Sequence, residues 1–160
     1  MKKNDTEGKV IELIIDGAIV DEYSEYYFKL HPKAYKPPII HPYHPSINEW
    51  MIMKRPMMNA LKQKWKAFVV WVVQKYGFNG LQIENCDAEF TTYYKPGHRH
   101  DVDNSVPKMI LDGFIEAGLL VDDDSKHLNS LKLMCAYDKD NPRTEIKLFI
   151  NKEKKDVKEE

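Results

Sequence analysis

The sequence has few cysteines, no long apolar run and no leader-like beginning. Its two cysteines, Cys86 and Cys135, stand far apart, and neither belongs to a CxxC pair. This excludes a disulfide framework and a zinc-finger pattern, and it fits a reducing compartment. No apolar run reaches the roughly 18 residues of a membrane span, and the opening MKKNDTEGKV lacks the apolar core of a secretory signal. We therefore expect a cytoplasmic protein without a membrane partner.

Charge is nearly balanced overall but unevenly spread. The 160 residues carry a net charge of −1, and their 42% hydrophobic and 31% charged content is typical of one soluble globular domain. Positions 29–75 hold nine Lys or Arg and one acid, Glu49, which leaves 24 − 9 = 15 bases and 25 − 1 = 24 acids elsewhere. A basic middle and an acidic second half suit a protein that binds a polyanion and holds cations. For any single lysine, solvated surface charge is the simpler interpretation.

Hydrophobic periodicity predicts the order β-α-β-α-β-β. The charged ends, 1–9 and 152–160, are expected to be flexible, which leaves one domain over 10–151. The pattern predicts an α+β fold: a single domain with a mixed, mostly antiparallel β-sheet packed with two main helices. The expected elements are strands over 10–20 and 81–94, a proline-rich loop over 31–49, helices over 56–76 and 104–117, and a hairpin of strands 128–137 and 144–151 joined by DKDNPR.

Two acidic clusters flank the second predicted helix. Asp101 and Asp103 precede it, and three consecutive aspartates, Asp122, Asp123 and Asp124, follow it. If the backbone is extended at the first cluster, its two carboxylates lie side by side. Because a helix of about 13 residues is only about 20 Å long, a short return segment could bring the second cluster toward the first.

Carboxylates that converge in this way need a cation. Two of them about 5 Å apart repel by about 3 kcal/mol at an effective dielectric near 20. Hard divalent ions with oxygen ligands are the usual solution, and such ions drive phosphodiester hydrolysis. Lys108 would add a fixed positive charge near a phosphate. The simpler alternatives are that both clusters are solvated turns and that Asp112 pairs with Lys108. His98 and His100 have the spacing of paired metal ligands but lack a third ligand with zinc-like spacing.

Several motifs follow one another in a fixed order around these acids. They are P-S-x-N at 45–48, D-x-D-N at 101–104, a lysine at 108, L-D-G at 111–113, G-L-L-x-D-D at 118–123 and a closing strand in DNPRTEIKLFI. The ordered set resembles the RusA family of Holliday junction resolvases over residues 87–150, and more weakly upstream. The sequence departs from the family pattern by one extra residue between Asp103 and Lys108.

The resemblance implies a small, homodimeric, Mg²⁺-dependent endodeoxyribonuclease, with Mn²⁺ as a second usable ion. It would resolve four-way DNA junctions by paired cuts in recombination and repair, in a bacterial cell and encoded by its chromosome or by a phage. The metal site would consist of Asp101, Asp103 and Asp123, with Lys108 assisting catalysis. The candidates for contact with the DNA backbone are Lys54, Arg55, Lys62, Lys64, Lys66 and Arg99.

The sequence is also compatible with two other functions. One is a metal-dependent nuclease that acts on flaps or forks, and the other is a non-catalytic nucleic-acid-binding α+β module whose acids are structural. The consecutive aspartates also leave the register of the third ligand open. The family spacing from Lys108 selects Asp123, since 108 + 15 = 123, and in an extended segment Asp123 would point with Val121 toward the protein body, opposite to Asp122 and Asp124.

The first predicted helix is apolar over more than one face. Phe68, Val69, Val70, Trp71, Val72 and Val73 are consecutive. A helix at the surface of a domain needs only one apolar stripe, so the second apolar face must pack against another part of the protein or against a partner. A twofold-related partner subunit is one covering, and deep burial within one domain is the other.

Overall fold

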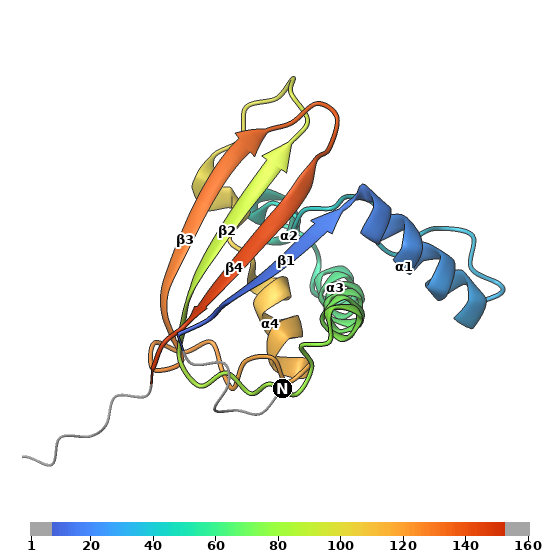
Figure 1. Ribbon diagram of the computed structural model, residues 1–160. Helices are drawn as coiled ribbons and strands as arrows, with labels where there is room; N and C mark the ends of the chain where they lie inside the picture. Colours follow the sequence, from blue (N-terminus) through green and yellow to red (C-terminus); the bar gives the residue numbers. More distant parts are fainter. Residues whose placement is uncertain (1–7, 153–160) are drawn as a thin grey trace, which may run out of the picture.

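The computed structural model describes residues 8–152, so the expected flexible ends lie almost wholly outside the described residues. Figure 1 shows the chain from β1 at its start to β4 at its end. The elements are β1 (Val10–Asp16), α1 (Gly17–Leu30), α2 (Ile47–Trp50), α3 (Arg55–Tyr76), β2 (Cys86–Tyr94), the 3₁₀ helix η2 (Val102–Ser105), α4 (Lys108–Glu116), β3 (Leu128–Tyr137) and β4 (Arg143–Ile150).

The four strands form one mixed sheet in the order β1-β4-β2-β3. β4 pairs antiparallel with β1 and with β2, whereas β2 and β3 run parallel. Residues of the two central strands alternate between buried and partly exposed positions, as a sheet covered on one face requires. The predicted α+β class and the mixed, mostly antiparallel sheet are confirmed.

The predicted hairpin of the last two strands is wrong. β3 and β4 run in opposite directions, but β2 lies between them and pairs with both. The connection 138–142 therefore spans two strand spacings, about 10 Å, which five residues easily do. Alternation along a strand predicts its buried face, but it contains no information on which strand is its neighbour.

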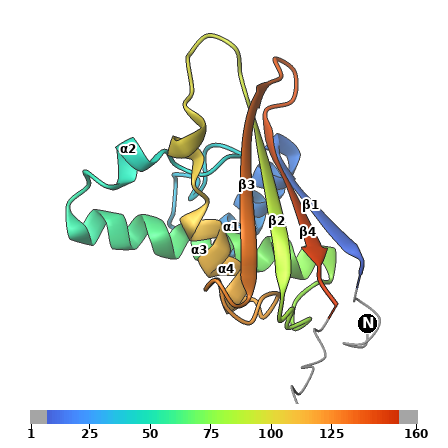
Figure 2. The same cartoon turned by 90° about the vertical axis from the view of Figure 1, so that its left-hand side faces the viewer.

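The helices α3 and α4 cover one face of the sheet, and Figure 2 shows both on that side. The core consists of the alternate strand residues and the facing sides of these helices. Gly113 permits the close approach of α4 to α3, because a Cβ built at this position would lie 2.5 Å from the side chain of Val69. This contact sets the position of α4, and with it the position of Lys108 at its first residue.

The expected strand over 10–20 is correct only as far as Asp16. The Asp16 carboxylate accepts a hydrogen bond from the Ile19 N–H at 2.9 Å and so caps helix α1. The apolar residues that follow fit a strand equally well, because the first turn of a helix is too short to reveal a period of 3.6 residues. Similarly, the strand expected from residue 81 begins at Cys86, and Ile83 makes only an isolated bridge with Leu120.

The apolar run of α3 is covered within the protomer. Phe68, Val69, Val72 and Val73 are at most 1% exposed. Tyr23 of α1 places its ring 5.0 Å from that of Phe68 and 5.3 Å from that of Trp71. The run therefore does not require a second subunit, and the homodimer is a prediction that rests on the family resemblance. Within residues 8–152, none of the helices combines the length and the apolar character that a bilayer crossing requires.

Candidate active site

The first acid pair lies in the connection between β2 and α4. Asp101 is extended (φ −90°, ψ 135°), but the following residues wind into η2, so Asp103 lies inside a helical turn. The expectation that the two side chains share one side of an extended segment is therefore wrong, because successive residues of a 3₁₀ helix are about 120° apart and not 180°. Both residues are exposed, and the Arg99 guanidinium lies 3.6 Å from the Asp101 carboxylate.

Helix α4 begins later than predicted. The helix expected from Asn104 begins at Lys108. Pro107 has no N–H and restricts Val106 before it to an extended conformation (φ −54°, ψ 120°), which separates η2 from α4. Ser105 does not cap the helix, because its hydroxyl donates to the Val102 carbonyl at 2.6 Å. Lys108 thus stands at the very start of α4.

A buried histidine from the proline-rich segment caps this helix start. The Met109 N–H donates to His44 Nε2 at 2.9 Å, and His44 Nδ1 lies 2.7 Å from the Pro45 carbonyl. Because a backbone N–H can only donate, Nε2 is unprotonated and Nδ1 donates to Pro45. Burial lowers the pKa of His44 to about 4, against the opposing effects of the Pro45 carbonyl and the Asp112 charge. A neutral imidazole therefore connects segment 44–50 (HPSINEW), which contains the P-S-x-N motif, to the residue after Lys108.

The Lys108 ammonium joins two carboxylates that are separated in the chain. Its Nζ is 3.1 Å from Asp112 Oδ1, one turn along α4, and 3.4 Å from Asp123 Oδ2, in the loop before β3. Burial by itself lowers the pKa of Lys108, but the hydrogen bonds and charges of Asp112 and Asp123 outweigh it and raise the pKa above its usual range. The lysine side chain is 47% exposed, so a phosphate can still reach the charge.

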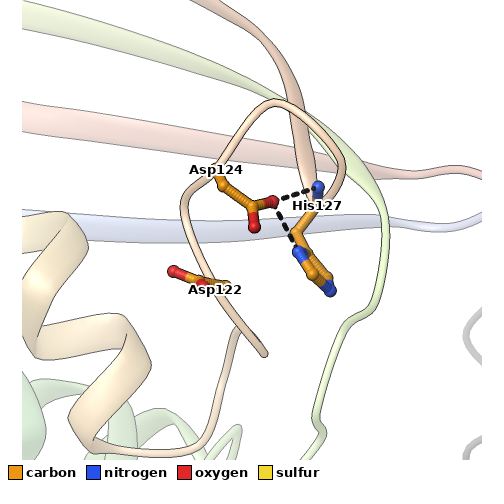
Figure 3. Close-up of side chains that lie close together, drawn as sticks. All are labelled: Asp122, Asp124 and His127. Carbon is orange, nitrogen blue, oxygen red and sulfur yellow. Dashed lines mark hydrogen bonds and ion pairs between the residues drawn. The ribbon is translucent and has the colours of Figure 1, made fainter.

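The three consecutive aspartates serve different contacts. Asp123 faces Lys108 with a side chain that is 24% exposed. Asp124 is turned the other way: it accepts hydrogen bonds from the backbone N–H of Lys126 and of His127, both at 3.1 Å, and lies 2.6 Å from His127 Nδ1. Figure 3 shows Asp124 and His127 joined in this way, with Asp122 beside them. The predicted alternation of Asp123 with its neighbours is present, but Val121 is 37% exposed and does not face the protein body.

The acids that lie close enough together to share a metal ion are not the acids that were predicted to bind one. Ligand atoms of Asp122, Asp124 and His127 lie within 4.8 Å of one another, and within residues 8–152 this is the group of three that comes so close. Hydrogen bonding explains this close approach without an ion. The hydrogen bond from His127 lowers the pKa of Asp124 and closes the turn. The predicted ligands Asp101, Asp103 and Asp123 do not form such a compact group. Two precede α4, and the third contacts its first residue.

The predicted DNA-binding residues are spread over α3 and the loop after β2. Lys54 and Arg55 are exposed at the start of α3. Lys62 lies over the Trp50 ring, 5.4 Å from its centroid, and Lys66 is 3.7 Å from Glu116 of α4. Lys64 is exposed, and the Arg99 side chain is 93% exposed. These side chains are therefore available at the surface, although Lys66 and Arg99 already have acidic neighbours.

His44 is the residue near the site that the sequence reading missed. A lone histidine between prolines in a loop has no periodic signal, and its partner, Met109, lies 65 positions away. The only hint was that HPSINEW belonged to the ordered motifs. Asp112 was recognised as a possible partner of Lys108, and their separation of four residues within α4 places them in contact.

No protein-family model matches the chain, and no curated protein is significantly similar to it. The resemblance therefore rests on the ordered motifs.

Proposed function

We propose that the protein is a divalent-metal-dependent endodeoxyribonuclease that cuts branched DNA, with four-way junctions as its main substrate. The observation that supports this best is the contact of Lys108 with Asp123. It brings together two of the ordered motifs, Lys108 and G-L-L-x-D-D, at the start of α4, which follows the exposed Asp101 and Asp103 in the chain. Cationic and acidic groups that meet at one exposed position suit a phosphodiester, which has to be both bound and attacked.

Asp101, Asp103 and Asp123 would hold Mg²⁺ or Mn²⁺. The chemistry of the donors fits these ions, because carboxylate oxygens are hard ligands and all three residues are at least partly exposed, but the three carboxylates would have to come closer together to share one ion. A bound ion lowers the pKa of its water and neutralises charge on phosphate oxygens. The side chains of the protein bind and orient the DNA. Lys108 binds a phosphate oxygen, and Asp112 keeps the Lys108 ammonium in position.

The start of α3 supplies a second contact with the DNA backbone. Lys54 occupies the N-cap position without a side-chain cap hydrogen bond, Arg55 follows, and the first turn contains no acid. Positive side chains at the positive end of a helix dipole are unfavourable unless an anion binds there. Figure 2 shows α2 and the first turns of α3 extending beyond the sheet, where a DNA backbone can approach them.

Cleavage of synthetic DNA tests this proposal directly. Purified protein is incubated with labelled four-way, flap, fork and linear DNA, with Mg²⁺ or with EDTA, at matched DNA occupancy. We expect paired nicks near the branch point of the four-way DNA with Mg²⁺ and none with EDTA. Asp21→Asn, which removes an exposed charge from α1, is the matched control for the site variants. Preference for flaps or forks would favour the second nuclease activity, and binding without any cutting would favour a non-catalytic module.

Assembly is measured on the same preparation. Symmetric resolution needs two equal sites, which a twofold homodimer provides. Light scattering at micromolar concentration should therefore give twice the mass of the chain. A strict monomer that still makes paired nicks would show that the two cuts are made in separate encounters.

A further inference from the structure

A cavity of about 330 Å³ opens beside the candidate active site. It lies between the proline-rich segment 38–46, helices α2 and α3, and the end of β2. This volume is at the small end of the range for ligand pockets, roughly 300 to 1,000 Å³. The residues that matter for its chemistry are Tyr43, His44, Glu49, Trp65, Tyr94 and His100.

Much of the wall consists of flat aromatic rings. The rings of Tyr94 and His100 are parallel to within 2°, with centroids 3.6 Å apart. Tyr43 meets Tyr94 edge-on at 4.9 Å and stacks parallel to His41 at 5.1 Å. Trp65 is 4% exposed and Tyr94 is 7% exposed, so the platform is held rigidly by the core. Such a wall suits a flat, aromatic occupant.

The cavity also contains a few polar groups. Burial raises the pKa of Tyr43, and the charge of Glu49 adds to the effect. Burial likewise raises the pKa of Tyr94 to about 12. Both hydroxyls are therefore protonated at neutral pH and offer donors, while the Glu49 carboxylate offers an acceptor. An occupant with its own ring donors and acceptors is better suited than a pure hydrocarbon.

Two wall residues connect the cavity to the two ends of the candidate active site. His100 directly precedes Asp101 in the chain. His44 accepts a hydrogen bond from the N–H of Met109, which directly follows Lys108. The cavity therefore lies next to both the acidic residues and the lysine. Two cations are also near the cavity: Arg99 adjoins His100 in the chain, and Lys62 lies over the ring of Trp50 in α2.

We propose that this cavity binds one unpaired nucleobase of the DNA strand whose phosphate lies at Lys108. This inference rests on the proposed function and deepens it, because it makes an unstacked base part of the recognised substrate. An unpaired or distorted position costs least to unstack, which favours branch points over regular duplex. Stacking on aromatic side chains contributes affinity with any base, since every base has a π face.

A double-mutant cycle between Tyr43 and the DNA tests the proposal. A single abasic residue is moved through the positions around the branch point of a four-way DNA, and the dissociation constant is measured by fluorescence anisotropy in EDTA. At one position, removing the base should raise the dissociation constant of wild type about tenfold more than that of Tyr43→Ala. Tyr43→Phe keeps the ring but lacks the hydroxyl donor, so its abasic effect should lie between those of wild type and Tyr43→Ala. Tyr35→Ala removes a tyrosine that is 84% exposed outside the cavity and serves as the matched control.

The outcomes separate this proposal from the nuclease activity. If Tyr43→Ala unfolds, Tyr43→Leu removes the flat ring but retains apolar volume, and the same cycle is run with it. Equal abasic effects in wild type and in the Tyr43 variant at every position would overturn the cavity proposal, even if Mg²⁺-dependent cutting is intact. A tenfold coupling without any cutting would support the cavity and refute the nuclease. A protein that binds no DNA would overturn both.

Discussion

The loop before β3 has two sides with different chemistry. On one side Asp123 contacts Lys108, whose ammonium also contacts Asp112, and this group adjoins the capped start of α4. On the other side Asp124 accepts three hydrogen bonds from residues of its own loop, and Asp122 accepts one from the N–H of Asp123. Adjacent carboxylates of the same residue type thus take opposite roles.

The difference lies in where the hydrogen-bond partners come from. The hydrogen-bond partners of Asp124, which are Lys126 and His127, lie within three positions of it, so the loop could make these contacts on its own. The partner of Asp123 lies 15 positions away and is held by the packing of α4 on α3. A carboxylate with local partners closes a turn, whereas one that tertiary packing places against a lysine is available for chemistry. If this distinction holds, substitutions on the Lys108 side of the loop should have larger effects than substitutions on the Asp124 side.

The largest effect is expected from Asp123→Asn. This variant should lose cleavage at least about a hundredfold at every Mg²⁺ concentration, because it removes a candidate ligand that also contacts Lys108. Asp122→Asn and Asp124→Asn should retain measurable cutting. The rates are compared at matched occupancy of four-way DNA. If Asp124→Asn is inactive and Asp123→Asn cuts normally, the two sides of the loop have been assigned the wrong way round.

Asp103→Asn should separate binding from cutting. Cleavage should be abolished, because the substitution removes a candidate metal ligand. Junction binding should persist or become tighter, because the exposed carboxylate of the wild type repels phosphates. Gel shifts in EDTA and cleavage assays with Mg²⁺ measure the two properties on one preparation. Undiminished cutting by Asp103→Asn, with Asp21→Asn as the control, would remove this residue from the metal site.

A pH-dependent loss of stability should arise from His44, on the Lys108 side. The unfolded chain binds a proton at this imidazole near pH 6.5, whereas the folded protein does so only near pH 4. The contribution to stability is therefore fully present above pH 6.5 and is lost as the pH falls to 4, by about (6.5 − 4) × 1.36, or about 3 kcal/mol. Urea unfolding between pH 7 and 4 should show a shallower decline for His44→Gln than for wild type.

The control for that measurement is His127, on the other side of the loop. His44 is 5% exposed, whereas the His127 side chain is 19% exposed and its Nδ1 lies 2.6 Å from Asp124 of the same turn. His127→Gln should leave the difference in unfolding free energy between pH 7 and pH 4 closer to that of wild type than His44→Gln does. An equal flattening by both variants would show that His44 does not have a special role.

The smallest effect is expected from Asp124→Asn. An asparagine still offers an oxygen acceptor to the backbone N–H groups of Lys126 and His127, so the turn should persist. The melting temperature should fall by less than in His44→Gln, because the lost charge is at the surface. A larger fall, measured by circular dichroism, would indicate that the loop depends on this charge.

Local features of the chain were largely predictable. The helix α3 was recognised within one residue of its start, because Pro56 suits a first turn and Gly77 adopts the left-handed conformation (φ 76°) that ends it. The strand β3 was predicted with its observed bounds, and β4 was predicted within one residue of each end. Within the site, the spacing of Lys108 and Asp112 predicted their contact, since four residues correspond to one helical turn.

Features that depend on distant partners were not predictable. The start of α1 was missed because its Asp16 cap looks like an ordinary residue at a strand end, and the conformation of Asp103 was missed because η2 has too few residues to show a period. The role of His44 could not be derived either, because nothing in a proline-rich loop indicates that an imidazole will accept the N–H of Met109.

The amino-acid sequence was enough to predict the α+β class, the main helix, the bounds of the last two strands and the acidic residues around Lys108. These follow from short-range rules, since helical and strand periods and turn preferences act over a few residues. Three features became known from the folded structure: β2 lies between β3 and β4, His44 caps α4, and Asp123 and not Asp124 faces Lys108. Each of these depends on which surfaces pack together, and the free energy of packing is shared among residues that are far apart in the chain.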